Sequence, residues 1–546
     1  MPSRLALAAL LPLALAAGTT ARHDALPAIV FVSRNPPPLG LRGAIPGLGP
    51  GQRTLATGGR LMLRAPGGAV RELLPEAALF DVSDPCVSPD GRRVAFAATV
   101  APDSAWRIWM AALDGGRSPA GIRAAPVQIT RPPARPGTAR AHDFDPCWVD
   151  DSTLCFASTR FPQVAQYDGS ATSNLFLVRL AGGEPLRITS ERNGAEEPAM
   201  DFRRGRIVFA RWWHNRYMAS ADPSGLTTDL ARALPGDTVN LWHAMEVAPD
   251  GADERLACGA PASRLGAMAY QPAVLADGSI AAVYGANLGL SPQSGGTGIQ
   301  RFAPRASRGR RLVGAIVEPG QPGTRAGYGN PSGLAPASAC SPAGLPDGRV
   351  LFAYDPGGRG DFGLYVMHAD GSGLERVLDL PGTLELDPAP VVVQRMRRAV
   401  RLPRAAPGEL PVTTLDQALR LPSRFRFLNL NVFARPPAGR GLPAGPRPVA
   451  GARIRFYATL ARPGAAGGDT ATLIREAAVG ANGRVDEPGL PAGLPMFEQL
   501  VDAQGRVLLG AHGPAHVAGL NAGAAGAVTR CIGCHVGHST LPVPGH

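Results

Sequence analysis

The residues of this chain that are best suited to chemistry form the motif Cys531-x-x-Cys534-His535. This spacing is the attachment signature of c-type haem. Two thiols so placed can add to the two vinyl groups of one haem, and the adjacent imidazole then reaches the iron from one face. We therefore predict one covalently bound haem c, with Cys531 and Cys534 as attachment residues and His535 as an axial ligand.

The opposite face of the iron takes its ligand from another part of the chain. His516 and His512 precede the motif and are separated from it by an Ala/Gly-rich stretch that could fold over the haem, and we predict His516 ahead of His512. His538 follows His535 too closely to reach the other face, and Met496 is a more remote alternative. The remaining alternative is an open or water-filled position.

Two further chemistries share the Cys-x-x-Cys spacing. A thioredoxin-like pair expects a βαβ context. A zinc site expects more Cys or His at metal-ligand spacing, and His512, His516 and His538 could complete one. Both stay open beside the haem interpretation, which is favoured by a signal for export, because covalent haems are attached in exported proteins.

That signal lies in residues 1–21. Arg4 provides a basic n-region, residues 5–17 an apolar h-region, and Ala14-Leu15-Ala16 a cleavage site. No later run approaches the ~18 apolar residues that a membrane-spanning helix needs. We expect a periplasmic or otherwise exported mature protein with no transmembrane segment.

A recurring proline-centred phrase organises residues 26–400. Each phrase is followed by a turn, such as Asp90-Gly91, and by a β-rich run, such as Arg93–Ala97. Long repeats with four short strands each predict a β-propeller, and six phrases predict six blades. Strands at 29–33 and 61–64 have no phrase before them and the last phrase has no blade after it, so the two ends should complete one blade. The central prolines are Pro85, Pro146, Pro198, Pro272, Pro342 and Pro388.

The residue before each central proline is polar in every repeat. If these side chains face a central channel, the carboxylates among them could bind a cation. The favoured alternative is that they accept hydrogen bonds from backbone N–H groups of neighbouring strands. The residues are Asp84, Asp145, Glu197, Gln271, Ser341 and Asp387. Segments 211–217 and 240–243, rich in aromatic and basic residues, predict either a binding surface or packing within the blades.

Five cysteines precede the haem motif at scattered positions. We expect them to be small buried hydrophobic residues and not a disulfide framework. Cys147 and Cys155 could also face each other across a hairpin that turns at Asp150-Asp151-Ser152. The five are Cys86, Cys147, Cys155, Cys258 and Cys340.

Beyond a proline-rich linker, residues 412–510 alternate between apolar and polar side chains. Ile454, Phe456 and Leu460, for example, alternate with Arg453 and Arg455. This pattern predicts a small β-sandwich-like domain. The haem-binding tail 511–546 is too short to bury a haem alone, so the haem must pack against the sandwich or the propeller. The predicted fold class is all-β: a six-bladed propeller, a sandwich-like domain and a short C-terminal haem-attachment segment.

Composition limits the class of partner. The chain of 546 residues has a formal charge of +12, which ordinarily suggests a nucleic acid or an anionic membrane. It contains no lysine, however, and its arginines are dispersed along an Ala/Gly/Pro-rich sequence. We interpret the charge as coding bias and expect no nucleic-acid partner. The Gly-x-Ser-x-Gly motif of serine hydrolases does not occur in the sequence.

Several segments together resemble the hydrazine synthase alpha subunit-related family. They are Glu196–Ala199, Arg206–Arg216, Phe497–Leu500, His512–Gly519 and Cys531–Ser539. The proline-centred repeat resembles the WD-like repeats of periplasmic Tol-type propellers. The first resemblance implies an exported haem-bearing enzyme subunit whose propeller scaffolds the haem region and which works with partner subunits. The haem attachment residues of that family carry over onto the single motif of this chain.

These expectations define a class of function. We expect an exported c-type cytochrome-like protein that uses one haem for electron transfer or small-molecule redox chemistry, with the propeller as a docking scaffold. Its partner would be a redox protein or a small-molecule substrate, and it could belong to a hetero-oligomer. If it is an enzyme, the resemblance implies a haem-dependent oxidoreductase. The alternative is a non-enzymatic propeller scaffold with a structural haem.

Overall fold

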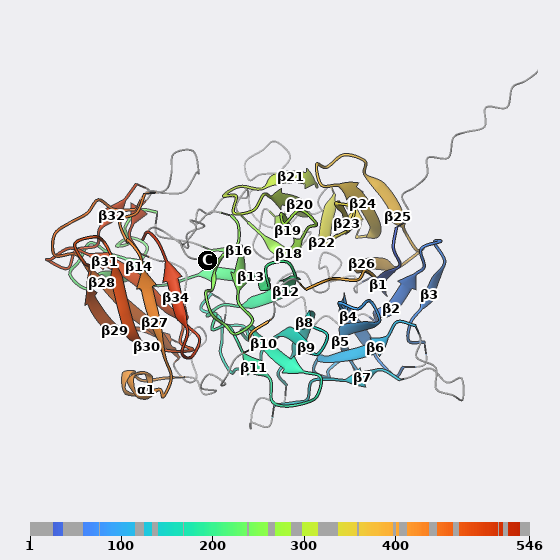
Figure 1. Cartoon of the computed structure of the whole chain (residues 1–546), viewed down its shortest axis with the longest axis horizontal. Coiled ribbons are helices and arrows are strands. Elements are labelled where there is room, and N and C mark those ends of the chain that lie inside the picture. Colours follow the sequence, from blue (N-terminus) through green and yellow to red (C-terminus); the bar gives the residue numbers. More distant parts are fainter. Residues whose placement is uncertain are drawn as a thin grey trace, which may run out of the picture.

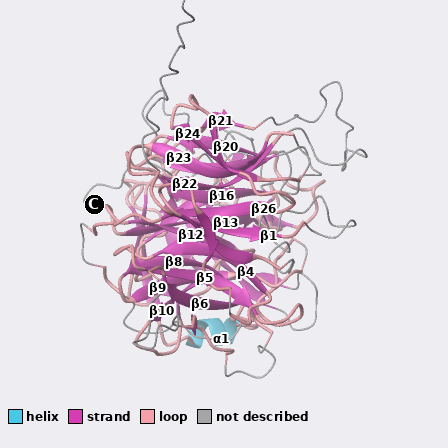
Figure 2. Cartoon of the chain, turned by 90° about the vertical axis from the view of Figure 1, so that its right-hand side faces the viewer, coloured by secondary structure: helices cyan, strands magenta, loops and turns pink. Residues whose placement is uncertain are grey.

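The computed structural model is nearly all-β (Figure 2). The predicted export signal, residues 1–21, and the proline-rich linker, residues 403–411, lie outside the residues that it describes. Within the described residues, nothing has the length and hydropathy of a membrane-spanning helix. The structure describes residues 26–36, 58–75, 77–114, 125–133, 140–167, 169–236, 240–259, 268–285, 297–314, 337–357, 360–396, 400–402, 412–435, 445–461, 469–511, 513–516 and 522–534.

Six four-stranded antiparallel sheets, counted over the described residues, form the blades of a β-propeller. This confirms the six blades that the six phrases predict. The strand that carries each central proline lines the central channel. The first two blades are β4 (Asp81–Val87), β5 (Arg93–Thr99), β6 (Arg107–Ala112) and β7 (Val127–Gln128), then β8 (Asp143–Asp150), β9 (Thr153–Ser158), β10 (Asn174–Arg179) and β11 (Leu186–Arg187).

The next blade carries an insertion. A hairpin of β14 (Met218–Ala219) and β15 (Leu226–Thr227) separates its second and third strands. The blade consists of β12 (Ala195–Asp201), β13 (Arg206–His214), β16 (Asn240–Val247) and β17 (Arg255–Leu256). Two regular blades follow: β18 (Tyr270–Val274), β19 (Ile280–Gly285), β20 (Thr297–Phe302) and β21 (Arg310–Val313), then β22 (Ser338–Gly344), β23 (Arg349–Asp355), β24 (Gly363–His368) and β25 (Glu375–Leu378).

The last blade is built from both ends of the propeller. Its innermost strand is β26 (Leu384–Pro390), and the other three are β1 (Ile29–Arg34), β2 (Arg60–Arg64) and β3 (Val70–Glu72). Antiparallel pairing of β26 with β1 runs from Ile29↔Pro390 to Arg34↔Leu384. The predicted closure is confirmed, and β26 covers the edge of β1 that would otherwise be unpaired.

The residue before each central proline has a left-handed backbone. Its φ lies between 46° and 54° in all six repeats, and the strand register shifts at the same point, which is the signature of a β-bulge. Asp145 Oδ2 accepts a hydrogen bond of 2.8 Å from the backbone N–H of Glu197 in the next blade. Gln271 Oε1 likewise accepts from Ser341 N–H at 2.8 Å. At these positions the side chains hold neighbouring blades together, as the favoured interpretation predicts.

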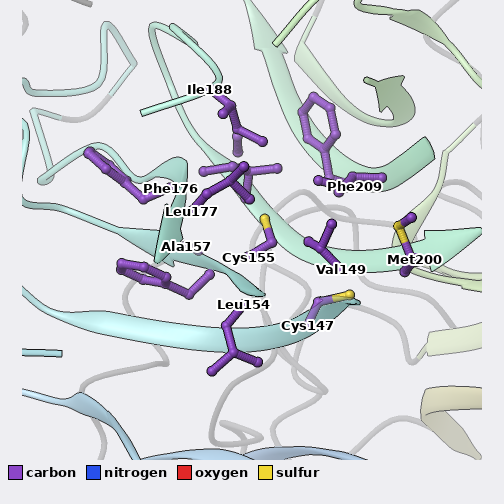
Figure 3. Packing of buried hydrophobic residues seen from close by; sticks show 14 of the residues in the cluster. Cys147, Val149, Leu154, Cys155, Ala157, Phe176, Leu177, Ile188, Met200 and Phe209 are labelled. Carbon is purple, nitrogen blue, oxygen red and sulfur yellow. The ribbon is translucent and has the colours of Figure 1, made fainter. Parts of the chain in front are cut away.

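The propeller core spans successive blades. One cluster joins strands of the β4, β8 and β12 blades, and Figure 3 shows its central part, where side chains from β8, β9 and β10 meet those from β12 and β13. The tryptophans of segments 211–217 and 240–243 are also core residues: Trp213 is 1% exposed, and Trp212 and Trp242 stack at 5.9 Å. Their role is therefore packing within the blades.

The C-terminal unit is a β-sandwich, coloured orange to red beside the propeller in Figure 1. Phe427 of one sheet and Phe456 of the other meet in a T-shaped contact at 5.0 Å. One helix that the alternation did not predict precedes the strands, α1 (Leu415–Arg420), with a capping box between Thr414 and Gln417. One sheet consists of β30 (Val485–Pro491), β27 (Arg424–Asn429) and β34 (Val528–Cys531), the other of β29 (Asp469–Ala478), β28 (Arg453–Ala461) and β31 (Met496–Val501), and a hairpin of β32 (Leu509–Gly510) and β33 (Gly513–Pro514) follows.

The Phe456→Ala substitution should lower the free energy of unfolding of the sandwich by about 3–5 kcal/mol. The ring is fully buried between the two sheets, so its removal leaves a cavity. Urea unfolding measures the effect. Leu509→Ala is the control, because its side chain is 61% exposed, and it should change the stability by less than about 0.5 kcal/mol. A Phe456→Ala protein as stable as the wild type would contradict this packing.

Candidate functional site

The Cys-x-x-Cys pair lies at the end of β34, where this strand pairs in parallel with β27. The loop that follows β27 holds Gly533 and Cys534. The Gly533 N–H donates to the carbonyl of Asn431 at 2.8 Å, and the Cys534 N–H donates to the carbonyl of Val432 at 2.8 Å. Asn429 Nδ2 donates to the carbonyl of Gly533 at 2.9 Å. The backbone of the pair is thereby fixed to the sandwich.

Both thiols of the pair are free and face the interior of the sandwich. Cys534 is 4% exposed, whereas Cys531 is half-buried. Burial raises the pKa of each thiol above its ordinary value, and the nearby carboxylate of Glu498 raises both further. The two cysteines are therefore neutral thiols at neutral pH. The structure brings together the two attachment residues that the motif predicts.

The predicted histidines are placed differently. His535, His512 and His538 lie outside the described residues. His516 is fully buried, and both of its ring nitrogens have hydrogen-bond partners. Nε2 lies 3.0 Å from the carbonyl oxygen of Tyr217, to which it donates, and Nδ1 lies 3.1 Å from the amide nitrogen of Gln499, from which it accepts. His516 thus joins the sandwich to the propeller.

His516 and the cysteine pair occupy opposite faces of β31. Successive side chains of a strand point to opposite faces. Glu498, the neighbour of the thiols, points into the sandwich, whereas Gln499, the neighbour of His516, donates to the carbonyl of Gly225 in the propeller at 2.6 Å. His516 as the second axial ligand therefore stays a prediction, one that requires the ring to give up both hydrogen bonds. Among the described residues, no three His, Cys, Asp or Glu side chains gather as a metal-binding group.

A buried ion pair fixes the sandwich against the propeller. Asp469 of β29 is 3.2 Å from Arg192 Nε, in the loop before β12, and both side chains are almost fully buried. Gln166 Nε2 also donates to the carboxylate of Asp469. The Tyr217 hydroxyl donates to the backbone oxygen of Asp469 at 2.8 Å, and its ring stacks on Phe497. No motif in the sequence marked these contacts, because their partners are far apart along the chain.

A hollow of about 550 Å³ opens beside Cys534. Gly445 connects the two, since it lines the hollow and a Cβ placed on it would lie 3.2 Å from the carbonyl oxygen of Cys534. Leu508 provides apolar lining, and the exposed side chains of Arg435 and Arg447 add two guanidinium groups. The hollow thus combines an apolar wall with groups that bind carboxylates.

Comparison with known proteins identifies the fold. No protein-family model and no curated protein matches the chain. Hydrazine synthase of Kuenenia stuttgartiensis is similar in structure, with a TM-score of 0.65 and 16% identity over 93% of this chain and 69% of that chain. TolB of Acinetobacter baumannii is also similar, with a TM-score of 0.39 and 14% identity over 66% of each chain. The propeller fold is thus related to that of hydrazine synthase, as the sequence resemblance predicts.

Alkaline solution should loosen the contact between propeller and sandwich. Burial and the carboxylate of Asp469 raise the pKa of Tyr217 to about 12, from about 10 in an unfolded chain. The protonated hydroxyl therefore stabilises the contact fully below pH 10, and this contribution is lost as the pH rises through about 12. Ultraviolet titration of the phenolates should show that Tyr217→Phe removes one tyrosine from the group that titrates late. Burial also raises the pKa of the other members of this group, which are Tyr284, Tyr354, Tyr365 and Tyr457. In the control Tyr167→Phe, where the side chain is 55% exposed, the late titration should remain.

Proposed function

We propose that this chain binds one haem c covalently through Cys531 and Cys534, with His535 as an axial ligand, and uses it for electron transfer or small-molecule redox chemistry. The observation that carries the proposal is the pair of free thiols at the end of β34 and three residues beyond it, where the backbone of Cys534 adjoins a hollow with apolar and cationic walls. A haem is flat and apolar and bears two carboxylates, so the residues present fit this group.

Each part of the site has a distinct task in this proposal. The loop after β27 fixes the backbone of the pair through Asn431 and Val432, and in this proposal both thiols attach to one haem. Leu508 and the buried side of the sandwich keep water from one face of that group. Arg435 and Arg447 supply cations for its carboxylates. When bound, the haem supplies an iron centre that takes up and releases one electron.

The proposal extends to location and partners. The signal-like residues 1–21 support export, which covalent attachment of haem would require, and the propeller would provide a docking scaffold. With a net charge of +12 and arginines spread over the chain, an acidic redox protein would be attracted more strongly than a basic one. The partner is accordingly proposed to be a redox protein or a small-molecule substrate, within a possible hetero-oligomer and without nucleic acid.

Covalent haem is tested by expression with a haem-maturation system. The purified protein should carry one haem that stays attached in denaturant and that dithionite reduces, as shown by its absorption spectrum. Cys531→Ala and Cys534→Ala should each lose a thioether bond, and the double variant should lose the covalent haem. Cys258→Ala is the matched control, because this buried thiol belongs to the propeller core, and its haem content should equal that of the wild type. A wild-type protein with no attached haem would overturn the proposal.

Binding of carbon monoxide tests the sixth position of the iron. Both ring nitrogens of His516 already have partners, so of the two predicted arrangements, His516 as ligand or an open position, we propose the open position and expect a spectral shift of the reduced protein with carbon monoxide. His516→Ala should leave this shift unchanged. If His516 were the ligand, the wild type would resist carbon monoxide and His516→Ala would bind it. A reduced protein that resists carbon monoxide in both forms would mean that another side chain, such as His512, fills the sixth position.

A further inference from the structure

A second pair of cysteines lies in the propeller, apart from the haem motif. Cys86 and Cys147 occupy the same position in two successive repeats, directly after the central prolines of β4 and β8. Both residues line the central hollow of the propeller, which has a volume of about 270 Å³. They therefore lie at the same level of the ring, on the innermost strands of neighbouring blades.

The two side chains contact each other across the gap between these blades. The Cys147 thiol donates to the carbonyl oxygen of Trp148 at 3.7 Å, and an interaction between the Cys86 and Cys147 side chains shifts the pKa of both thiols. Trp148 Nε1 donates to the carbonyl oxygen of Cys86 at 2.9 Å, which holds β8 against β4 at this level. Cys86 also packs against the buried cluster that contains Cys147, so a movement of these side chains can bring the two sulfur atoms to bonding distance.

The two thiols differ in reactivity. Cys86 is half-buried and reaches the hollow, whereas Cys147 is 3% exposed. The interaction with the Cys147 side chain lowers the pKa of Cys86, against the effect of burial, and the same interaction together with burial raises the pKa of Cys147. The thiolate is the nucleophile in disulfide exchange. Cys86 is thus the thiol that an oxidant meets first.

We propose that Cys86 and Cys147 form a reversible disulfide that ties the innermost strands of two neighbouring blades. The oxidant is a small disulfide that enters the central hollow. The Cys86 thiolate attacks one of its sulfur atoms, which forms a mixed disulfide and releases one thiol. Cys147 then gives up its proton and attacks the Cys86 sulfur, which releases the second thiol. Two protein S–H bonds are replaced by one S–S bond, and the oxidant is reduced to two thiols.

Cys155 is the competing partner. It lies directly opposite Cys147 in the antiparallel pairing of β8 and β9, as the hairpin prediction implied. It is fully buried in the core (Figure 3), and burial raises the pKa of its thiol above the ordinary value. The Cys155 thiol is out of reach of an oxidant in the hollow, and it stays protonated, so it is not suited to disulfide exchange. The pairing across the blades is therefore favoured over the pairing within one blade.

Peptide mapping of the full chain distinguishes the two pairings. The purified protein is incubated with oxidised glutathione or with a phosphine reductant, alkylated in denaturant and digested with trypsin. Cys86 lies in the fragment 72–92, whereas Cys147 and Cys155 share the fragment 141–160. The proposed disulfide joins these two fragments and leaves Cys155 alkylated. A bond between Cys147 and Cys155 would instead stay within one fragment.

We expect the joined fragments in the oxidised wild type and in Cys155→Ala, and their loss in Cys86→Ser and Cys147→Ser. The oxidised wild type should also have a higher Tm than the reduced protein, and this difference should vanish in Cys86→Ser. Three results would overturn the proposal: alkylation of both Cys86 and Cys147 after oxidation, a glutathione that stays on Cys86, or a bond within fragment 141–160. The wild-type map needs no variant and does not depend on the haem.

Discussion

The antiparallel pairing of β1 with β26 is the contact on which the rest of the structure depends. It joins segments from the two ends of the propeller and completes the last blade. Only a closed ring brings the six innermost strands to a common channel, where Asp145 and Gln271 can reach the backbone of the next blade. Closure also fixes where the β14–β15 hairpin and the loop with Arg192 meet the sandwich. The position of the sandwich relative to the propeller, and with it that of the Cys531 and Cys534 pair, thus depends on a contact made far from the pair.

The sandwich is held against the propeller mainly by buried polar groups, each of which has its own specific partner. Asp469 meets Arg192, Gln166 and Tyr217, and His516 meets Gln499 and Tyr217. Buried polar groups of this kind are costly unless each one is satisfied, so they specify one relative position of the two units. An aromatic contact adds to this polar docking on the outer face of β28. Tyr457 lies on the side of the strand that carries Arg453 and Arg455, yet it is buried against Phe497 and near Tyr217.

The sequence was informative wherever a local pattern sufficed. The proline-centred phrase predicted the blades and their closure, and the alternation around Phe456 predicted the sandwich, because both patterns follow from the geometry of strands. The spacing of Cys531 and Cys534 predicted that they lie together. The position of His516 could not be inferred, since its partner Tyr217 lies in another domain and no local pattern links the two. Helix α1 was missed although its capping pair, Thr414 and Gln417, was visible in the sequence.

The parallel pairing of β34 with β27 has a consequence for access to the buried thiols. β34 is an edge strand with one partner, and β27 keeps its antiparallel ladder with β30 when β34 detaches. Local opening of an edge strand costs less free energy than unfolding of the domain. Such an opening would uncover Cys531 while the core around Phe427 and Phe456 stays folded. Cys534 would still be held by its backbone hydrogen bond to Val432, so the two thiols would differ in how readily they are reached.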